Sequence, residues 1–464
     1  MIDLLESLIE EALKLGASYA DVRFQEVESS VITVENSRLK NYGKSALSGL
    51  GVRVLVDNTL GITSSTILEP KHLLEQVGNA VKATRTIAKR TNPTHLRNAT
   101  PLRKSAKSSY SKKPDSLSDE EKISLVVDAN KSATLKGITN RITSLGWFTE
   151  RRVFKSSEGA EVSVETTMTG LAHSSVAASS GQMEYVSDSR SKCAGFEFIL
   201  KEDWGLFTEE ISKLSLQMVE ARSPKPRVYE VVADSDLIGL ILHEAFGHAS
   251  EGDLVATKES VLEGRRGDRI ASPQVTLIDE GVVEGGYYLP FDDEGVEKGR
   301  QIIVEKGVLK SFLHSRETAY KLGVPSSGNA RAQGFGNKPI VRQTNLFMEQ
   351  GDQSREELLE DIKDGLYICG AGARGGQVNV AMGTFTFRVG PSYTIKSGEI
   401  GELVRGVSIS GTILETLRSV VAVGEDFAIS TSLFGGCGKD GQRVRVGHGG
   451  PHVRIKSMMV GGGE

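Results

Sequence analysis

The chain has 464 residues, of which 38% are hydrophobic and 25% are charged, and its formal net charge is −4. Glycine is abundant, with 51 residues, or about 11% of the chain against an average near 7%. This composition excludes a disordered, collagen-like or coiled-coil chain and indicates a soluble, turn-rich globular protein of about three domains. The three cysteines, Cys193, Cys369 and Cys437, lie too far apart for a CxxC zinc knuckle, an iron–sulfur motif or a disulfide scaffold.

The first fifteen residues carry an apolar stripe interleaved with acids. Apolar residues recur at spacings of three and four between Leu4 and Leu13, which predicts an amphipathic surface helix that ends at Gly16. A signal peptide would instead start with basic residues and continue as an uninterrupted apolar run. No other stretch approaches the eighteen or so apolar residues that a membrane span needs. We therefore expect a cytoplasmic protein with no membrane partner.

Alternation of apolar and polar residues and helical periodicity predict the elements of the N-terminal region, residues 1–222. Strands are predicted at 19–27, 31–39, 51–64 and through 138–180, with turns at 35–37 and 57–58, and helices are predicted at 69–89, from 119 to about 136 after a capping box at Ser118, and at 203–221. The prediction is an α+β region with antiparallel sheets and flanking helices. The repeated element order is compatible with two similar halves, residues 1–90 and 115–222.

The segment between these halves, residues 84–114, is strongly basic. It contains nine Lys or Arg, no acid, and many Ser, Thr and Pro, which leaves a charge of −13 (−4 minus 9) on the rest of the chain. Such a composition is typical of a solvated linker or long loop. Without interleaved aromatic residues it favours the linker over a nucleic-acid patch, so no nucleic-acid partner is expected.

Residues 223–464 have a different pattern of apolar residues and glycines. Short alternating runs separated by glycine turns predict a large β-rich C-terminal domain, and one helix begins after Asp234. That helix contains His243 and Glu244, followed by His248. The pattern resembles the helix of zinc proteases, where two imidazoles bind the metal and the adjacent carboxylate activates a water.

The two histidines are five residues apart, however, and not four. On an ideal helix five residues advance a side chain by roughly 500°, which leaves the two rings about 140° apart and unable to share one ion. His243 and His248 can bind the same metal only if the helix widens into a π-turn or ends between them. Gly247 is the position where this distortion costs least.

A third ligand must come from elsewhere in the chain. Cys437 is the most suggestive candidate, because flanking glycines allow close approach and Lys439 favours the thiolate. Other residues with suitable side chains are Glu251, Asp253, His448 and His452. The residues alone leave this choice open, and a buried structural thiol is the alternative for Cys437.

Three further patterns carry less information. The acidic run Asp292-Asp293-Glu294 is compatible with a substrate-binding or calcium-like loop and equally with a solvated turn. Residues 370–375 fit the dinucleotide fingerprint, but the strand-like alternation behind them offers no helix for a pyrophosphate. Gly438-Lys439 lacks the first glycine and the Ser or Thr of a P-loop. Neither glycine motif supports nucleotide binding.

Five short motifs occur along the chain in a fixed order. They are His243 to His248, Glu251-Gly-Asp253, Asp292 to Gly295, Gly375-Gly-Gln377 and Cys437 to Gln442. Together they resemble the TldD/PmbA family of metallopeptidases over nearly the whole chain. Because PmbA-type (TldE) subunits lack the paired-histidine motif, the resemblance indicates the TldD-type, catalytic member.

The resemblance implies a zinc ion held by His243, His248 and Cys437, with Glu244 as general base. It also implies a TldE/PmbA-like partner in a heterodimer that encloses a chamber, and hydrolysis of unfolded or short polypeptides. His448 and His452 are outside the family pattern. The alternative function is a peptide-binding scaffold with a structural zinc, but such a site needs no carboxylate beside its first ligand.

Overall fold

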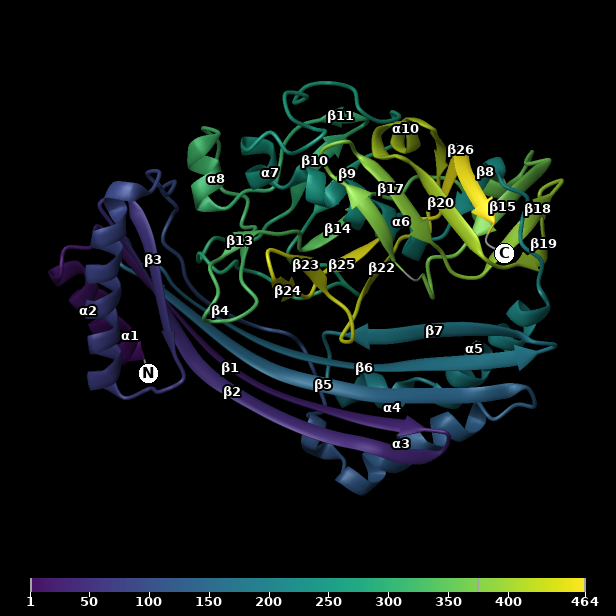
Figure 1. Cartoon of the computed structure of the whole chain (residues 1–464), viewed down its shortest axis with the longest axis horizontal. Helices are drawn as coiled ribbons and strands as arrows, with labels where there is room; N and C mark the ends of the chain where they lie inside the picture. The colour runs from purple at the N-terminus through teal and green to yellow at the C-terminus, as the bar shows by residue number, and fades with distance from the viewer. Residues whose placement is uncertain (1, 374, 463–464) are drawn as a thin grey trace.

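The N-terminal part of the chain forms one long, curved sheet, and the C-terminal part packs on its concave side (Figure 1). The computed structural model describes residues 2–373 and 375–462. The sheet has the strand order β3-β2-β1-β5-β6-β4, and β7 also pairs with β6. Its strands are β1 (Tyr19–Glu35), β2 (Arg38–Val56), β3 (Thr59–Ser65), β4 (Arg103–Lys107), β5 (Ile138–Ser156), β6 (Glu161–Ser179) and β7 (Gln182–Lys192).

Two-residue turns connect the first three strands where they were predicted. Asn36, Ser37, Asp57 and Asn58 all have positive φ, between 47° and 65°. Such mirror-image turns match the twist of the flanking strands, and Asn and Asp tolerate this backbone conformation. The strands are longer than predicted, because β1 is paired with β2 on one side and β5 on the other, and so continues through the polar residues 28–30.

Pairing of β1 with β5 makes residues 1–90 and 115–222 contribute to a single sheet. The basic segment between them contains a strand that was not predicted. β4 pairs in parallel with β6, so residues 103–107 are not part of a linker. Four of its five side chains are exposed, and a strand that contributes mainly backbone hydrogen bonds leaves almost no apolar pattern in the sequence.

Helices cover the sheet in two groups. The helices are α1 (Ile2–Lys14), α2 (Pro70–Ile87), α3 (Asp119–Ser132), α4 (Phe196–Lys201) and α5 (Trp204–Glu220). α1 and α2 pack at one end of the sheet, and α3, α4 and α5 pack on its convex side (Figure 1). The predicted capping box of α3 is present, with Ser118 accepting the N–H of Glu121. Short 3₁₀ turns lie at Ala88–Arg90 and Pro114–Ser116.

The C-terminal part is built from two larger sheets and two two-stranded sheets. One sheet has the order β16-β17-β20-β26-β8-β15-β18-β19, with β21 paired to β26, and the other has the order β11-β10-β9-β14-β25-β22. The first contains β8 (Arg227–Ala233), β15 (Asp364–Ile368), β16 (Gly376–Asn379), β17 (Thr384–Arg388), β18 (Ser392–Lys396), β19 (Glu399–Val404), β20 (Val407–Thr412), β21 (Val420–Val423) and β26 (Val453–Gly462). The second contains β9 (Leu277–Asp279), β10 (Gln301–Glu305), β11 (Val308–Leu309), β14 (Asn345–Met348), β22 (Ala428–Thr431) and β25 (Gly447–Gly450). Two-stranded pairs are formed by β12 (Ala330–Arg331) with β13 (Ile340–Val341) and by β23 (Cys437–Lys439) with β24 (Gln442–Val444).

One helix of this region, α6 (Ser235–Ile241), lies in the core shared by these sheets. Leu237, Ile238 and Ile241 have no exposed surface, and each such side chain contributes about 1.5–3 kcal/mol by burial. The rigid core therefore holds the segment that follows α6. The shorter helices are α7 (Gly252–Ala256), α8 (Arg316–Lys321), α9 (Arg355–Leu359) and α10 (Ile413–Arg418).

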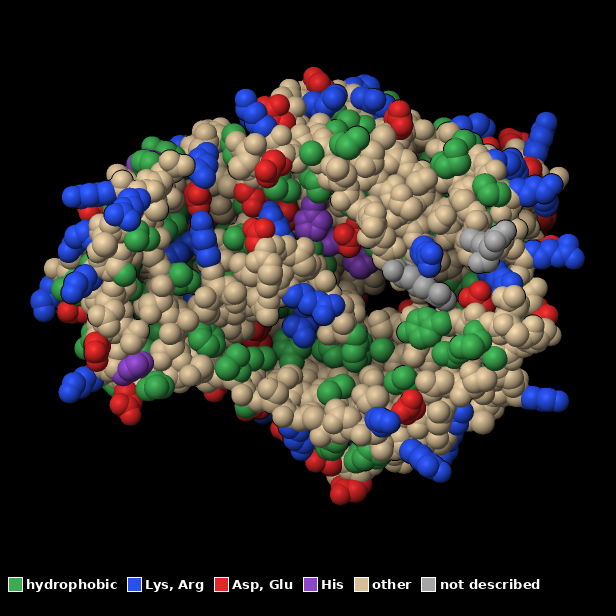
Figure 2. All heavy atoms as spheres, viewed as in Figure 1, with side chains coloured by type: hydrophobic (Ala, Val, Ile, Leu, Met, Phe, Trp, Pro, Cys, Tyr) green, Lys and Arg blue, Asp and Glu red, His purple; other side chains and the backbone are tan. Residues whose placement is uncertain are grey.

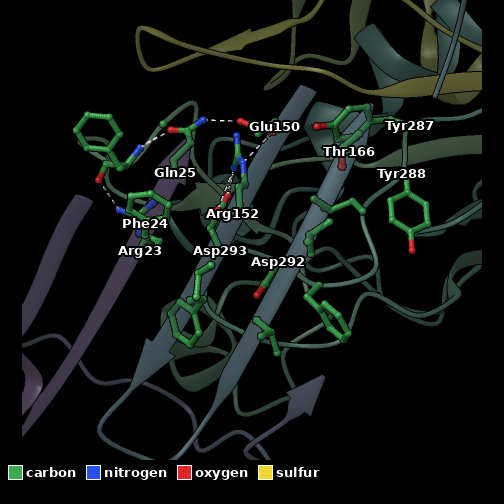
Figure 3. Close-up of a pocket in the computed structure, with 18 residues that line it drawn as sticks. Arg23, Phe24, Gln25, Glu150, Arg152, Thr166, Tyr287, Tyr288, Asp292 and Asp293 are labelled. Carbon is green, nitrogen blue, oxygen red and sulfur yellow. Dashed lines mark hydrogen bonds and ion pairs between the residues drawn. The ribbon is translucent and has the colours of Figure 1, made fainter. Parts of the chain in front are cut away.

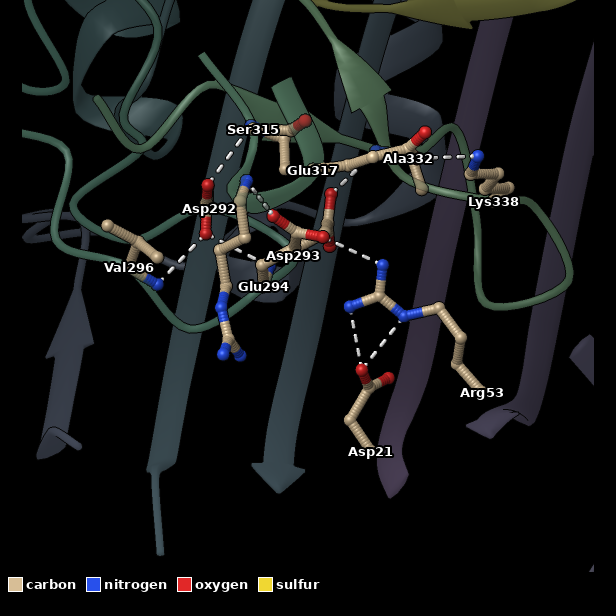
Figure 4. Close-up of polar contacts among 12 residues, drawn as sticks. Asp21, Arg53, Asp292, Asp293, Glu294, Val296, Ser315, Glu317, Ala332 and Lys338 are labelled. Carbon is tan, nitrogen blue, oxygen red and sulfur yellow. Dashed lines mark hydrogen bonds and ion pairs between the residues drawn. The ribbon is translucent and has the colours of Figure 1, made fainter. Parts of the chain in front are cut away.

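The acidic run at residues 292–294 attaches this region to the sheet (Figure 4). Glu294 pairs with Arg53 of β2 at 2.8 Å, and Asp293 pairs with Arg152 of β5 at 3.0 Å. Asp292 is buried and accepts three backbone N–H groups, from Glu294, Val296 and Ala330. The run is therefore neither a solvated turn nor an open substrate or calcium loop, because its carboxylates are already used by arginines and backbone amides.

The prediction of an α+β fold with a β-rich C-terminal region that carries the histidine helix is confirmed. Among the described residues, no helix combines the length and the apolar character needed to cross a membrane.

Candidate metal centre

The helix that carries the histidines widens between His243 and His248. Asp234 caps α6 by accepting the N–H of Leu237, and the helix continues as a π-helix over Leu242–Gly247 and a 3₁₀ turn over His248–Ser250. The wider turn brings the rings of His243 and His248 to 5.5 Å between centroids. The irregular turn that the two histidines would need to share one metal ion is therefore present.

A glycine and a glutamine shape the π-turn. The Gln343 amide donates to the backbone carbonyl of His243 at 2.9 Å, so it satisfies an acceptor within the distorted helix. A Cβ atom at Gly247 would lie 2.0 Å from Oε1 of Gln343, so no larger residue fits there unless Gln343 moves. Gln343 had no signal in the sequence.

Cys437 joins the two histidines, although it lies 189 residues after His248. One donor atom from each of His243, His248 and Cys437 lies within 4.8 Å of the others, and we call these three residues the donor cluster. The Cys437 sulfur is 3.2 Å from Nε2 of His248, and the cysteine is 5% exposed. Imidazole and thiolate are both zinc ligands, and catalytic zinc sites have three protein ligands and keep a fourth position open.

The charges within the donor cluster suit a cation. Burial alone would raise the pKa of Cys437, but hydrogen bonds and positive charge from His243 and His248 lower it to about 5. Burial would lower the pKa of His248, but Glu251 and the cysteine raise it to about 11. Nδ1 of His243 is buried and has no hydrogen-bond partner among the described residues. The chemistry of this set therefore fits a metal ion, which would replace the protons that these groups hold.

A second layer of charged residues surrounds His248. The Glu251 carboxylate, which is fully buried, lies 3.1 Å from Nδ1 of His248. Lys439 donates to Glu251 at 2.8 Å, to Asp253 at 2.6 Å and to the carbonyl of Val341 at 3.2 Å, which uses all three ammonium hydrogens. Glu251 and Asp253 thus contact Lys439 and do not join the donor cluster. Lys439 acts on the carboxylates, whereas the sequence suggested that it acts on the thiol.

The other two histidine candidates are also outside the donor cluster. His448, on β25, has its ring 6.0 Å from that of His243, and burial together with His243 lowers its pKa to about 4. A Cβ at Gly239 would lie 2.8 Å from Cδ2 of His448, so this helix glycine makes the room that the ring occupies. His452 is bound instead by Asp426 and by the hydroxyl of Tyr367.

Glu244 follows His243 directly and is half-buried. It makes no hydrogen bond or ion pair with another described residue, in contrast to Glu251. Figure 2 shows histidine side chains gathered beside an opening in this face of the molecule. A carboxylate that lies next to a donor residue and has no partner in the described part of the chain is available to accept a proton.

The two glycine motifs are placed as expected. β16 follows residues 370–375, so no helix is available there to hold a pyrophosphate; residue 374 lies outside the described part of the chain. Gly438 and Lys439 lie within β23 and form no phosphate-binding loop.

Comparison with known proteins shows which family the chain belongs to. Three family models, described as PmbA/TldA metallopeptidase domain 1, central domain and C-terminal domain, match residues 20–88, 112–219 and 226–462. The chain belongs to the PmbA/TldD metallopeptidase family. The resemblance stated from the motifs is confirmed.

Relatives within the PmbA/TldD family are named as proteases. A metalloprotease of Methanothermobacter thermautotrophicus is 37% identical over 444 residues, which cover 96% of this chain and 95% of that protein. A zinc metalloprotease TldD homolog of Saccharolobus solfataricus is 29% identical over 459 residues, covering 98% and 99%. The solved structure of TldE from Thermococcus kodakarensis has a TM-score of 0.76 at 20% identity, covering 99% of this chain and all of that one, so the two share the fold.

Proposed function

We propose that the chain is a zinc-dependent peptidase of the TldD type, which hydrolyses peptide bonds in unfolded or short polypeptides. The observation that carries the proposal is the donor cluster of His243, His248 and Cys437 beside the unpaired carboxylate of Glu244. The naming of a full-length relative as a zinc metalloprotease supports the choice of metal.

Each residue has a distinct role in this proposal. His243, His248 and Cys437 would hold the zinc ion, which when bound polarises a scissile carbonyl and lowers the pKa of a water. Glu244 accepts the proton of the attacking water and returns it to the leaving amine. Glu251 keeps the His248 ring in place and selects the tautomer whose Nε2 faces the cluster.

The proposed partner is a TldE/PmbA-like subunit in a heterodimer. The resemblance implies this assembly, and the shared fold with TldE supports a paralogous pair that evolved from one ancestor. Enclosure of the site between two subunits would restrict hydrolysis to polypeptides that are unfolded or short.

The second candidate function is a peptide-binding scaffold with a structural zinc. Structural zinc sites are closed by four protein ligands, whereas the described residues supply three donors and one unpaired carboxylate. The scaffold is therefore the weaker candidate, and loss of hydrolysis on changing Glu244 separates the two.

The test uses the full chain with and without a TldE-like partner, an unfolded peptide followed by mass spectrometry, and elemental analysis of bound metal. Glu244→Gln is expected to keep zinc and to lose at least about a hundredfold in hydrolysis rate. The matched control, Glu263→Gln, changes an exposed glutamate and should keep the wild-type rate. Unchanged hydrolysis in Glu244→Gln would show that the mechanism is wrong.

The ligand set is tested separately. Cys437→Ala should lose most of the bound zinc, while Cys193→Ala, which removes another sequestered thiol, should keep it. If Cys437→Ala binds zinc normally and His448→Ala does not, the third ligand is His448 and not Cys437.

A further inference from the structure

A cleft of about 540 Å³ lies between the curved sheet and the loop that leads into β23. Its walls include Arg331, Arg443 and Arg445 and the aromatic rings of Phe335 and Phe434. We call this the basic cleft. It lies outside the donor cluster, and neither the metal nor Glu244 explains its charge.

Glycines on the sheet let the loops that form both walls of the basic cleft approach the sheet closely. A Cβ at Gly51 would lie 1.9 Å from the carbonyl oxygen of Phe335, and a Cβ at Gly49 would lie 2.3 Å from its ring. On the other wall, a Cβ at Gly146 would lie 2.3 Å from Leu433. These close approaches anchor the two loops on the sheet, so the space between them is a built feature of the fold.

Arg445 is the unexplained charge in the basic cleft. Its guanidinium carbon lies 4.2 Å from the centroid of the Phe148 ring, which holds it against the sheet. Its Nε is buried and has no hydrogen-bond partner among the described residues. The terminal nitrogens of Arg445 also make no hydrogen bond or ion pair with a described residue, so the guanidinium lacks an acceptor and can bind an anion in the cleft.

The neighbouring charges cannot supply that acceptor. Glu150 is the acidic residue that lines the cleft, and it is already bound by Gln25 and by Arg152 (Figure 3). Arg331 donates to the carbonyl of Arg445 at 2.6 Å, and so adds a second positive charge beside it. The cleft therefore carries excess positive charge and an apolar lining, a combination that suits a carboxylate on a flexible chain.

The location connects the cleft with the proposed peptidase site. Cys437 of the donor cluster pairs with Val444 across the hairpin, and Arg443, Val444 and Arg445 all line the basic cleft. A polypeptide that lies along this hairpin could therefore contact both the donor cluster and the basic cleft.

We propose that the basic cleft binds a carboxylate of the polypeptide substrate, with Arg445 as its principal ligand. The inference rests on the proposed function in that the ligand is a peptide. The carboxylate comes either from an acidic side chain or from the C-terminus, and both have the same chemistry.

The test measures binding and not turnover, in the zinc-loaded Glu244→Gln variant. Four fluorescent peptides of one unstructured sequence combine a central Glu or Gln with a free or amidated C-terminus. Peptides that carry the carboxylate bound by the cleft should bind roughly ten- to a hundredfold more tightly than peptides in which an amide replaces that carboxylate. Which pair differs identifies the side chain or the C-terminus as the source.

Two substitutions assign the preference to Arg445. Arg445→Met, which keeps an apolar stem over Phe148, should reduce the ratio of dissociation constants to about one without weakening the neutral peptide. Arg418→Met, which removes an exposed arginine of α10 outside the cleft, should leave the ratio unchanged. If Arg445→Met lowers the melting temperature, Arg445→Lys restores the charge and should recover part of the preference.

The outcomes separate this inference from the proposed function. Binding of all four peptides with equal affinity, or a carboxylate preference that persists in Arg445→Met, would contradict carboxylate binding by the basic cleft. Neither result would count against the proposed peptidase activity. Absence of any peptide binding would count against the peptidase as well. A carboxylate preference in binding, without hydrolysis by the wild-type chain, would support the basic cleft and contradict the proposed peptidase activity.

Discussion

Lys439 Nζ lies 2.8 Å from Glu251 Oε2, and the same carboxylate oxygen lies 3.1 Å from Nδ1 of His248. The lysine is two residues from Cys437, whereas Glu251 is three residues from His248. One ion pair therefore ties together the two chain segments that supply the donor cluster. Its geometry matches the outer-shell carboxylates that orient metal-binding histidines in other proteins.

Removing this lysine should weaken metal binding. Lys439→Met leaves Glu251 without its cation and frees the hairpin from the histidine segment, so zinc affinity is expected to fall about 10- to 100-fold. Competition with a chromophoric chelator measures the dissociation constant. The matched control is Lys298→Met, because Lys298 is even more buried and pairs with Asp279 at 3.0 Å elsewhere in the same region. An equal loss in both variants would mean that the effect is general destabilisation.

Gly247→Ala should disrupt the π-turn. The added Cβ would lie 2.0 Å from Gln343, so either the glutamine or the helix must shift. The expected cost in unfolding free energy is about 1–3 kcal/mol, accompanied by weaker zinc binding as the two histidines separate. Denaturant unfolding and chelator competition measure the two effects. Gly78→Ala, within α2, is the control. Its Cβ would lie 3.8 Å from Leu15, an ordinary contact distance, so alanine there should be neutral or stabilising.

Glu294→Gln should loosen the C-terminal part from the sheet. The Arg53 and Glu294 side chains are each 2% exposed. Arg53 keeps its second partner, Asp21, at 2.7 Å, so loss of the Glu294 charge should cost about 1–3 kcal/mol. Calorimetry should show a lower melting temperature or a separate transition. The exposed pair of Lys104 and Glu297 provides the comparison, because Glu297→Gln should cost less than about 1 kcal/mol. Equal melting temperatures for the two variants would contradict the assigned role.

Asp188 should make stability depend on pH. Burial, with a contribution from Asp236, raises the pKa of Asp188 to about 6. Because the folded value lies above the unfolded value near 3.9, its contribution is complete below about pH 4 and is lost as the pH rises through about 6. Asp188→Asn should therefore match the wild type at low pH and exceed it above pH 7, by on the order of 1–2 kcal/mol after allowance for partial solvent exposure.

Thermal unfolding across this pH range measures the difference. The control is Asp115→Asn, an exposed aspartate, whose melting temperature should follow the wild type at every pH. A constant offset between Asp188→Asn and the wild type would show that the carboxyl titrates normally.

Local features were predictable from the sequence because their causes are local. Positive-φ residues at Asn36-Ser37 and Asp57-Asn58 mark hairpin turns whatever packs around them. With a spacing of five residues, His243 and His248 could share one ion only if the helix was distorted, since the geometry of a helix is set by its own backbone. The residue motifs were also sufficient to indicate the family.

The tertiary structure decided everything that depends on distant segments. Cys437 and His448 were both candidates by chemistry, and only the packing of the β23–β24 hairpin and of β25 around α6 places the thiol in the donor cluster and leaves His448 beside it. Burial likewise changed the meaning of the acidic run at residues 292–294, which the sequence could equally have left in solvent. The physical reason is that contact between residues nearly two hundred positions apart depends on how whole sheets pack, which no local pattern encodes.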